Sequence, residues 1–167
     1  MRLAMRVALA GVFGTAVSGL TSMAQTPRQD EVAARGAEVM PFKLSATTHV
    51  FTKTSTGGIQ QVVAKNPSDA DQIRLIRAHL QDIAARFRQG DYSGPTETHG
   101  VQMPGLAKLR SARASDIRIL YTNLNNGAQI EYLAKSADLI SAIHQWFDAQ
   151  LSDHGTDAMA GHEHMHD

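Results

Sequence analysis

The sequence predicts an α+β fold, a two-layer sandwich in which a four-stranded antiparallel sheet is covered on one face by two amphipathic helices. Two short turns rich in Gly and Asn, at residues 55–58 and 125–127, each separate two strand-like segments. Two other segments, 70–89 and 139–154, repeat apolar residues every three or four positions, as amphipathic helices do. The order strand, turn, strand, cap, helix recurs in both halves of the chain, which predicts a ββα-ββα internal repeat.

The first 24 residues have the pattern of a cleaved Sec-type signal peptide. Arg2 and Arg6 form a basic start, residues 7–20 are apolar but too short to span a bilayer, and residues 22–24 give a small-x-small cleavage pattern. We expect cleavage after Ala24 and export to the periplasm or the medium. Because no Cys follows the apolar stretch, we expect no lipid anchor on the mature chain.

Composition narrows the classes of function. The chain has no Cys, so an exported protein of this sequence has neither disulfides nor thiolate metal sites. Its 16 Lys and Arg balance 16 Asp and Glu, and loss of the two leader arginines makes the mature chain slightly acidic. That charge gives no reason to expect binding to nucleic acid or to an anionic membrane surface.

The mature chain divides into three parts. Residues 25–46 are predicted to form an N-terminal arm, in which Gly36 and Pro41 limit any helix to a turn or two. Residues 47–155 are predicted to form a single α+β domain of ordinary size. Residues 156–167 are small, polar and rich in His and Met, and we expect this tail to be disordered.

The first strand pair is predicted at 44–53 and 59–65, where β-branched and aromatic residues are frequent. The side-chain period of two places His49 and Phe51 on one face of the sheet. Asp69 is placed to cap the helix that follows.

The second half repeats these signals. Strands are predicted at 116–124 and 128–135, and Ser136 or Asp138 caps the last helix. Gly155 follows this helix at the position that favours a left-handed C-terminal cap. The irregular stretch between the two halves, 91–114, is expected to contain one short helix at 104–111.

Five histidines come from five separate elements, and they are the main candidates for chemistry. His49 lies on a strand, His79 and His144 lie on or beside the apolar stripes of the two helices, His99 lies in a loop, and His154 ends the last helix. A core histidine bonded to a backbone group or a carboxylate is the alternative interpretation of each. Apposition of sheet and helices would bring three of them together, and imidazole suits copper, zinc, nickel or iron.

Two further signals concern metal ions. Met103 follows His99 by four residues, and a thioether favours Cu(I) over zinc, although Met103 can equally be a hydrophobic plug for its loop. The tail presents His162, His164 and His166 at alternate positions with a Met between the last two. Such a run is typical of loose binding of Ni, Cu or Zn, with a chance polar tail as the alternative.

Two other classes of function compete with metal binding. An enzyme could use a histidine as general base with Asp82, Asp148 or Asp153 as its orienting carboxylate. The sequence has no nucleophile elbow, and the stretch KTSTGG at 53–58 lacks the ending of a phosphate-binding loop. An exported protein that binds a partner through the edge strands of its sheet is the third class, and homodimerisation stays open.

Several segments resemble a family of small exported bacterial proteins of unsettled role, many of which carry the label aspartate carbamoyltransferase. The most specific are HGVQMPGL at 99–106 and AIHQWFDAQLSDHG at 142–155, and the resemblance covers roughly residues 35–158. The label implies carbamoyl transfer, for which carbamoyltransferase chains resemble two α/β domains with a Ser-Thr-Arg-Thr loop. This sequence has Ser-Thr-Gly-Gly at 55–58 and no room for a second domain, so we expect the label among relatives but not the activity.

The sequence therefore predicts a periplasmic metal-binding protein without assigned catalytic residues. Copper is the expected ion, with zinc or nickel as alternatives. The candidate ligands are His49, His79, His99, Met103, His144, His154, His162, His164 and His166.

Overall fold

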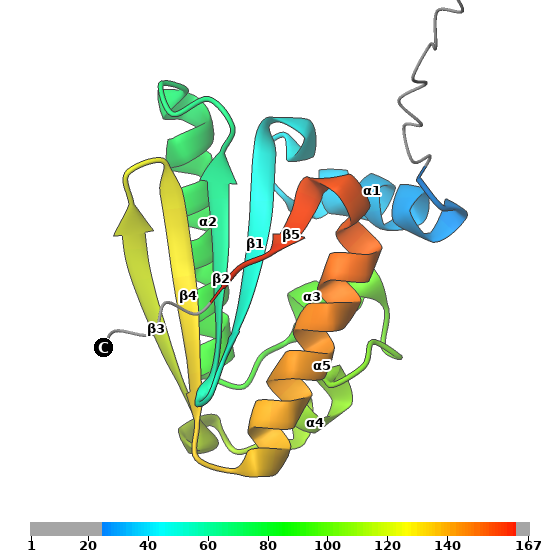
Figure 1. The fold of residues 1–167 in the computed structure, drawn as a ribbon, viewed down its shortest axis with the longest axis vertical. Coiled ribbons are helices and arrows are strands. Elements are labelled where there is room, and N and C mark those ends of the chain that lie inside the picture. Colours follow the sequence, from blue (N-terminus) through cyan, green and yellow to red (C-terminus); the bar gives the residue numbers. More distant parts are fainter. Residues whose placement is uncertain (1–24, 163–167) are drawn as a thin grey trace, which may run out of the picture.

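The computed structural model describes residues 25–162, and it has an α+β fold with five helices and five strands in that range (Figure 1). The predicted leader and its cleavage site lie outside the described residues, as do His164 and His166 of the tail. No helix within 25–162 is both long and apolar enough to cross a membrane. The helices are α1 (Pro27–Val39), α2 (Ala70–Arg88), α3 (Ser93–His99), α4 (Leu106–Ser111) and α5 (Ala137–His154). The strands are β1 (Thr47–Thr54), β2 (Gly57–Ala64), β3 (Ile117–Leu124), β4 (Gly127–Ala134) and β5 (Ala158–Ala160).

The strands form one mixed sheet in the order β3-β4-β2-β1-β5. The first four are antiparallel neighbours, but β5 runs parallel to β1, with Ala158 opposite His49. The expectation of a purely antiparallel four-stranded sheet was therefore wrong. Strand β5 lies within the tail that we expected to be disordered, and the sequence Ala-Met-Ala carries no strand signal of its own. The free edge of β1 supplies hydrogen-bond partners for the backbone of this segment. The amide of Gly161, for example, donates to the carbonyl of Phe51 at 2.9 Å.

Both long helices pack on the same face of the sheet. Tyr132, on the covered face of β4, lies 6.1 Å from Phe87 of α2 and 5.5 Å from Trp146 of α5, measured between ring centres. The two helical rings are themselves 5.8 Å apart. The core therefore lies between one sheet face and the α2–α5 layer, and alternate strand residues are buried as a period of two requires.

The two hairpins match closely in length and pairing. Each has two strands of eight residues joined by a two-residue loop, and each residue of the first hairpin has an equivalent 70 positions later. β2 and β4 join the hairpins in the middle of the sheet. The carbonyl of Thr56 accepts from Ala134 at 2.9 Å, and that of its equivalent, Asn126, accepts from Ala64 at 2.8 Å.

The start of α2 and the end of α5 follow the predicted signals, whereas Ser136, at the N-cap position of α5, makes no capping hydrogen bond with its side chain. The Asp69 side chain accepts a hydrogen bond from the Gln72 amide at 3.1 Å and so caps α2. Helix α5 ends at His154, and Gly155 takes a positive φ of 53°. The short helix expected at 104–111 is α4.

The N-terminal arm differs most from its prediction. Helix α1 has 13 residues and runs through Gly36, which is buried because the Leu44 side chain packs against it. The lack of a Cβ allows this close approach, and the contact outweighs the low helix propensity of Gly. Helix α3 was not predicted, because the sequence SGPTETH has no apolar periodicity.

Candidate functional site

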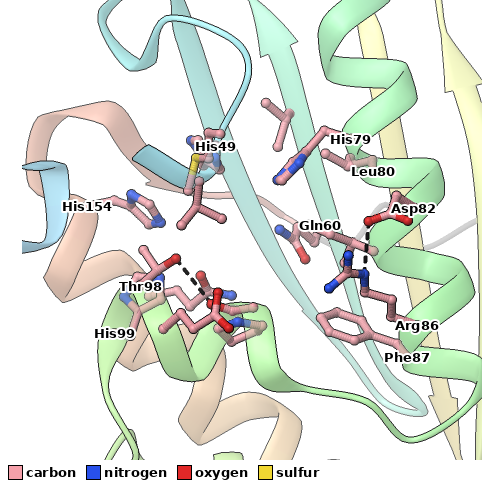
Figure 2. Close-up of a pocket in the computed structure, with 18 of the residues that line it drawn as sticks. His49, Gln60, His79, Leu80, Asp82, Arg86, Phe87, Thr98, His99 and His154 are labelled. Carbon is pink, nitrogen blue, oxygen red and sulfur yellow. Dashed lines mark hydrogen bonds and ion pairs between the residues drawn. The ribbon is translucent and has the colours of Figure 1, made fainter. Parts of the chain in front are cut away.

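A cavity of about 350 Å³ opens between α2 and α5 on the covered face of the sheet (Figure 2). Its floor is formed by β1 and β2, its walls by the two long helices, and its roof by α3 and residues 38–42. Four of the predicted ligands line it: His49, His79, His99 and His154. Their elements are far apart in the chain, so the cavity exists only in the folded protein.

Three of these histidines, His49, His99 and His154, form a group of neighbouring rings, and His49 is the most buried of them. Its position on β1 turns the side chain toward the helices, where it is 3% exposed. The ring stacks on His154 with centres 4.6 Å apart and planes 10° apart, and its Nδ1 has no hydrogen-bond partner among the described residues. Burial lowers the pKa of His49 to about 4, so the ring is neutral at pH 7.

His154 and His99 complete the group from two helix ends. Their ring centres are 5.1 Å apart and the planes meet at 77°. Burial lowers the pKa of His154 well below its ordinary value, and it also lowers the pKa of His99. All three imidazoles are therefore neutral at pH 7, and each keeps a lone pair on one ring nitrogen.

Asp153 fixes the tautomer of His99. The carboxylate Oδ2 lies 2.9 Å from His99 Nδ1, so a neutral His99 donates its Nδ1 proton there and leaves Nε2 as the acceptor. Arg28 of α1 holds Asp153 from the other side, with contacts of 3.1 and 2.8 Å. Burial raises the pKa of Asp153, but the hydrogen bonds from Arg28 and His99 outweigh it and lower the pKa overall.

His79 lies on the other side of the group. It projects from α2, and Phe42 contacts both His79 and His49, with ring centres 5.5 and 6.1 Å away. Figure 2 shows His79 projecting from α2 into the upper part of the cavity, toward the side where His49 lies. Burial lowers the pKa of His79 as well.

Acidic side chains surround the entrance of the cavity. Glu38, Asp82, Asp91 and Glu97 are exposed and line it, against a single cation, Arg86, which pairs with Asp82 at 3.0 Å. The local charge at the entrance is therefore negative. Such a field attracts cations and repels anions.

Sequence reasoning missed two polar residues of the cavity wall. Gln60 accepts from the Tyr132 hydroxyl at 2.7 Å through Oε1, which leaves its Nε2 without a hydrogen bond among the described residues. Trp146 is 1% exposed and its Nε1 has no partner in the described part of the chain. Gln60 is flanked by apolar residues and Trp146 belongs to an apolar stripe, so neither gave a signal of its own.

The remaining predicted ligands lie elsewhere. His144 Nε2 contacts the carbonyls of Thr54 and Gly57 at 3.0 and 2.9 Å, which ties α5 to the first hairpin. Met103 is buried outside this cavity, beside a separate surface groove, and His162 is exposed. Within residues 25–162, no group of three His, Asp or Glu side chains is arranged to hold a metal ion.

Comparisons with protein-family models, with curated proteins and with solved structures gave no match.

Proposed function

We propose that this is a periplasmic metal-binding protein that holds a transition metal ion, with copper as the first candidate, between His49, His99 and His154. The observation that carries the proposal is that His154 contacts both His49 and His99, so that three neutral imidazoles from three separate elements line one cavity. Two imidazoles that share a tetrahedral metal at about 2.0–2.1 Å have ring centres roughly 5 Å apart. The separations of 4.6 and 5.1 Å agree with that spacing.

The environment of His99 supports a role as ligand. A metal-binding histidine commonly donates its second ring N–H to a carboxylate, which fixes the tautomer and the ring orientation. Asp153 occupies that position, and Arg28 holds it. His99 Nε2 is therefore the donor atom directed away from Asp153.

Binding requires one ring to turn. A metal ion lies in the plane of each imidazole that binds it, and the nearly parallel rings of His49 and His154 cannot both meet that condition. The unpaired Nδ1 of His49 favours the change, since a buried polar atom without a partner costs about 1–3 kcal/mol. Met40 lines the same cavity, and its thioether would favour Cu(I).

The charge of the entrance supports a cation as the natural ligand. The four carboxylates at the entrance attract a metal ion. They repel carbamoyl phosphate, which is an argument against the carbamoyltransferase activity that the family label implies. The tail with His162, His164 and His166 would add loose binding of metal ions. It follows β5, which pairs with β1 at the edge of the sheet.

A titration of the mature protein, prepared without an affinity tag, tests the proposal. Residues 162–167 are deleted to remove the tail histidines, while β5 and the Gly161 hydrogen bond are kept. We expect one Cu(I) per chain under anaerobic conditions, with zinc, Ni and Cu(II) titrated in parallel. His99→Gln and His154→Gln should each weaken binding about tenfold or more.

His144→Gln is the matched control, because it makes the same change in a histidine outside the cavity. A stoichiometry below one half in the truncated protein would contradict the folded site. So would an equal loss of affinity in His144→Gln and His99→Gln.

An enzyme is the second candidate, and the His99–Asp153 contact favours it. A histidine oriented by a carboxylate beside a cavity can act as a general base. The carbamoyl-transfer version is tested by incubating the protein with carbamoyl phosphate and aspartate, and absence of carbamoyl-aspartate rules that version out. Partner binding and homodimerisation stay predictions.

We also infer that the two ββα halves derive from one duplicated unit. The equal strands, equal loops and reciprocal hydrogen bonds of Thr56 and Asn126 support this. Exchange of the loops 55–56 and 125–126 tests it. Equivalent hairpins predict a change in unfolding free energy of about 1 kcal/mol or less, whereas loss of folding would contradict the inference.

A further inference from the structure

The cavity is much larger than a metal ion needs. Its volume of about 350 Å³ lies in the range of pockets that bind small organic molecules, which begins at about 300 Å³. An apolar cavity of about 150 Å³ already holds a benzene ring. The histidine group occupies the side next to β1 and α3, so the space beside α2 is left without a role in the proposed function.

The part of the cavity beside α2 has an apolar wall. Val62 of β2, Leu80, Ile83 and Phe87 of α2, and Trp146 of α5 line the cavity there. Figure 2 shows Leu80 and Phe87 on the α2 side of the cavity, opposite His154 and His99, with Gln60 between the two sides. A flat or compact apolar group can therefore lie against α2 without displacing the histidines.

Gln60 supplies hydrogen-bond donors beside the apolar wall. Its orientation is fixed, because Oε1 accepts from Tyr132, and so the N–H groups of Nε2 are left to donate. Polar groups inside native proteins are nearly always paired, so free donors beside a cavity indicate a ligand that supplies an acceptor.

The acidic entrance limits the charge of that ligand. A carboxylate or phosphate would satisfy the donors, but it would have to pass Glu38, Asp82, Asp91 and Glu97. Arg86 is the only cation among the residues that line the cavity, and Asp82 already pairs with it. An uncharged acceptor, such as a carbonyl oxygen, is favoured.

From these observations we propose that the side of the cavity next to α2 binds a small uncharged organic molecule with an apolar body and a carbonyl-type oxygen, beside the metal site. The apolar body lies against Phe87 and Leu80, and the oxygen accepts from Gln60 Nε2. The inference goes beyond the proposed metal binding, and it holds for the metal-free protein as well.

Fluorescence of Trp146 gives a direct test, because it is the only Trp in the chain and it lines the cavity. Benzamide is the probe, and benzoate is its control of nearly the same shape with a negative charge. The mature protein is titrated with each probe in EDTA. We expect a saturable change with benzamide, and an affinity for benzoate that is weaker by about tenfold or more.

Gln60→Glu removes the donor and keeps an oxygen for Tyr132, so benzamide binding should fall about fivefold or more. Gln61→Glu is the matched control, because it makes the same change on the open face of β2, where Gln61 bonds to Gln129, and it should bind benzamide as the wild type does. If Gln60→Glu does not fold, Ile83→Phe replaces it and should block the cavity.

The inference is overturned by any of three results. These are no saturable benzamide signal, equal affinity for benzamide and benzoate, or unchanged benzamide binding in Gln60→Glu or its replacement. Copper titration of the same preparations separates the two proposals. Benzamide binding without copper binding refutes the metal site alone, and copper binding without benzamide binding refutes the organic site alone.

Discussion

The two hairpins of the molecule have the same backbone plan but different buried side chains. In the first, β1 and β2 turn His49 and Gln60 toward the helices; in the second, the equivalent positions on β3 and β4 hold Ile119 and Ile130. The second hairpin packs tightly, with Ile130 fully buried. The first leaves a polar cavity. The same backbone plan therefore surrounds a packed core at the second hairpin and a cavity at the first.

The surroundings of the two hairpins account for this difference. Helices α1 and α3, the end of α5 and strand β5 all gather near β1 and bring Arg28, His99 and His154 with them. At the other side of the sheet, β3 is an edge strand, and among the described residues no further strand pairs with it. The asymmetry of the site therefore comes from segments outside the two hairpins.

The largest effect is expected from Ile130→Ala. This side chain lies in the packed second hairpin, and its truncation should lower the unfolding free energy by about 2–5 kcal/mol. Gln60→Ala, at the equivalent position, should cost about 1–3 kcal/mol, mainly because the Tyr132 hydroxyl loses its partner. Urea denaturation of both variants measures the difference. Equal losses would mean that the first hairpin is as tightly packed as the second.

His49→Ile makes the first hairpin resemble the second. It should also reduce the loss of folding stability that acid causes. The folded pKa of His49, about 4, lies below its unfolded value of 6.5, so neither state binds a proton there above pH 7. As the pH falls from 6.5 toward 4, only the unfolded state takes up the proton, and stability decreases. Between pH 7 and pH 5 this amounts to about 2 kcal/mol.

Urea denaturation at both pH values, in EDTA, measures this effect. The wild type should lose more stability on acidification than His49→Ile, by that amount. An identical loss in the two proteins would contradict the low pKa of His49.

Gly58→Ala tests a third difference between the halves. A Cβ at Gly58 would lie 2.4 Å from a ring carbon of Phe147, whereas the equivalent residue in the second hairpin is already Ala128. We expect Gly58→Ala to destabilise the protein by about 1–3 kcal/mol. Ala128→Gly should cost roughly 0.5–1 kcal/mol. Thermal unfolding compares the two, and a stabilising Gly58→Ala would show that Phe147 has room to move.

The smallest effect is expected from His144→Leu. It removes the imidazole that donates to the hairpin carbonyls of Thr54 and Gly57, at a cost of about 1 kcal/mol. Because His144 lies outside the cavity, copper affinity should stay unchanged. Calorimetric titration of the variant checks this, and a loss of affinity comparable to that of His99→Gln would place His144 in the metal site after all.

Much of the fold followed from local signals in the sequence. The glycine- and asparagine-containing loops, the Asp69 cap and the Gly155 stop each act within a few residues, so they located the hairpins and the ends of α2 and α5. β5 could not be predicted, because residues 158–160 form a strand only where β1 offers a free edge. Helix α1 likewise depends on a tertiary contact, at Gly36.

The site was predicted only in part. The sequence predicted that some of the five histidines would come together, but it did not predict which ones, and the contact of His49 with His154 is known only from the fold. His144 and His79 lie in similar positions beside the apolar stripes of their helices, but His144 contacts hairpin carbonyls and His79 lines the cavity. Arg28 had no local signal at all, because its partner Asp153 lies 125 residues away.

The proposed function requires the imidazoles of His49, His99 and His154 to meet at one metal ion in the cavity. X-ray absorption spectroscopy of the copper-loaded protein lacking residues 162–167 tests it most directly. We expect outer-shell scattering from two or three imidazole rings, reduced by about one ring in His49→Ile. A spectrum without imidazole scattering, or one that is unchanged in His49→Ile, would contradict it.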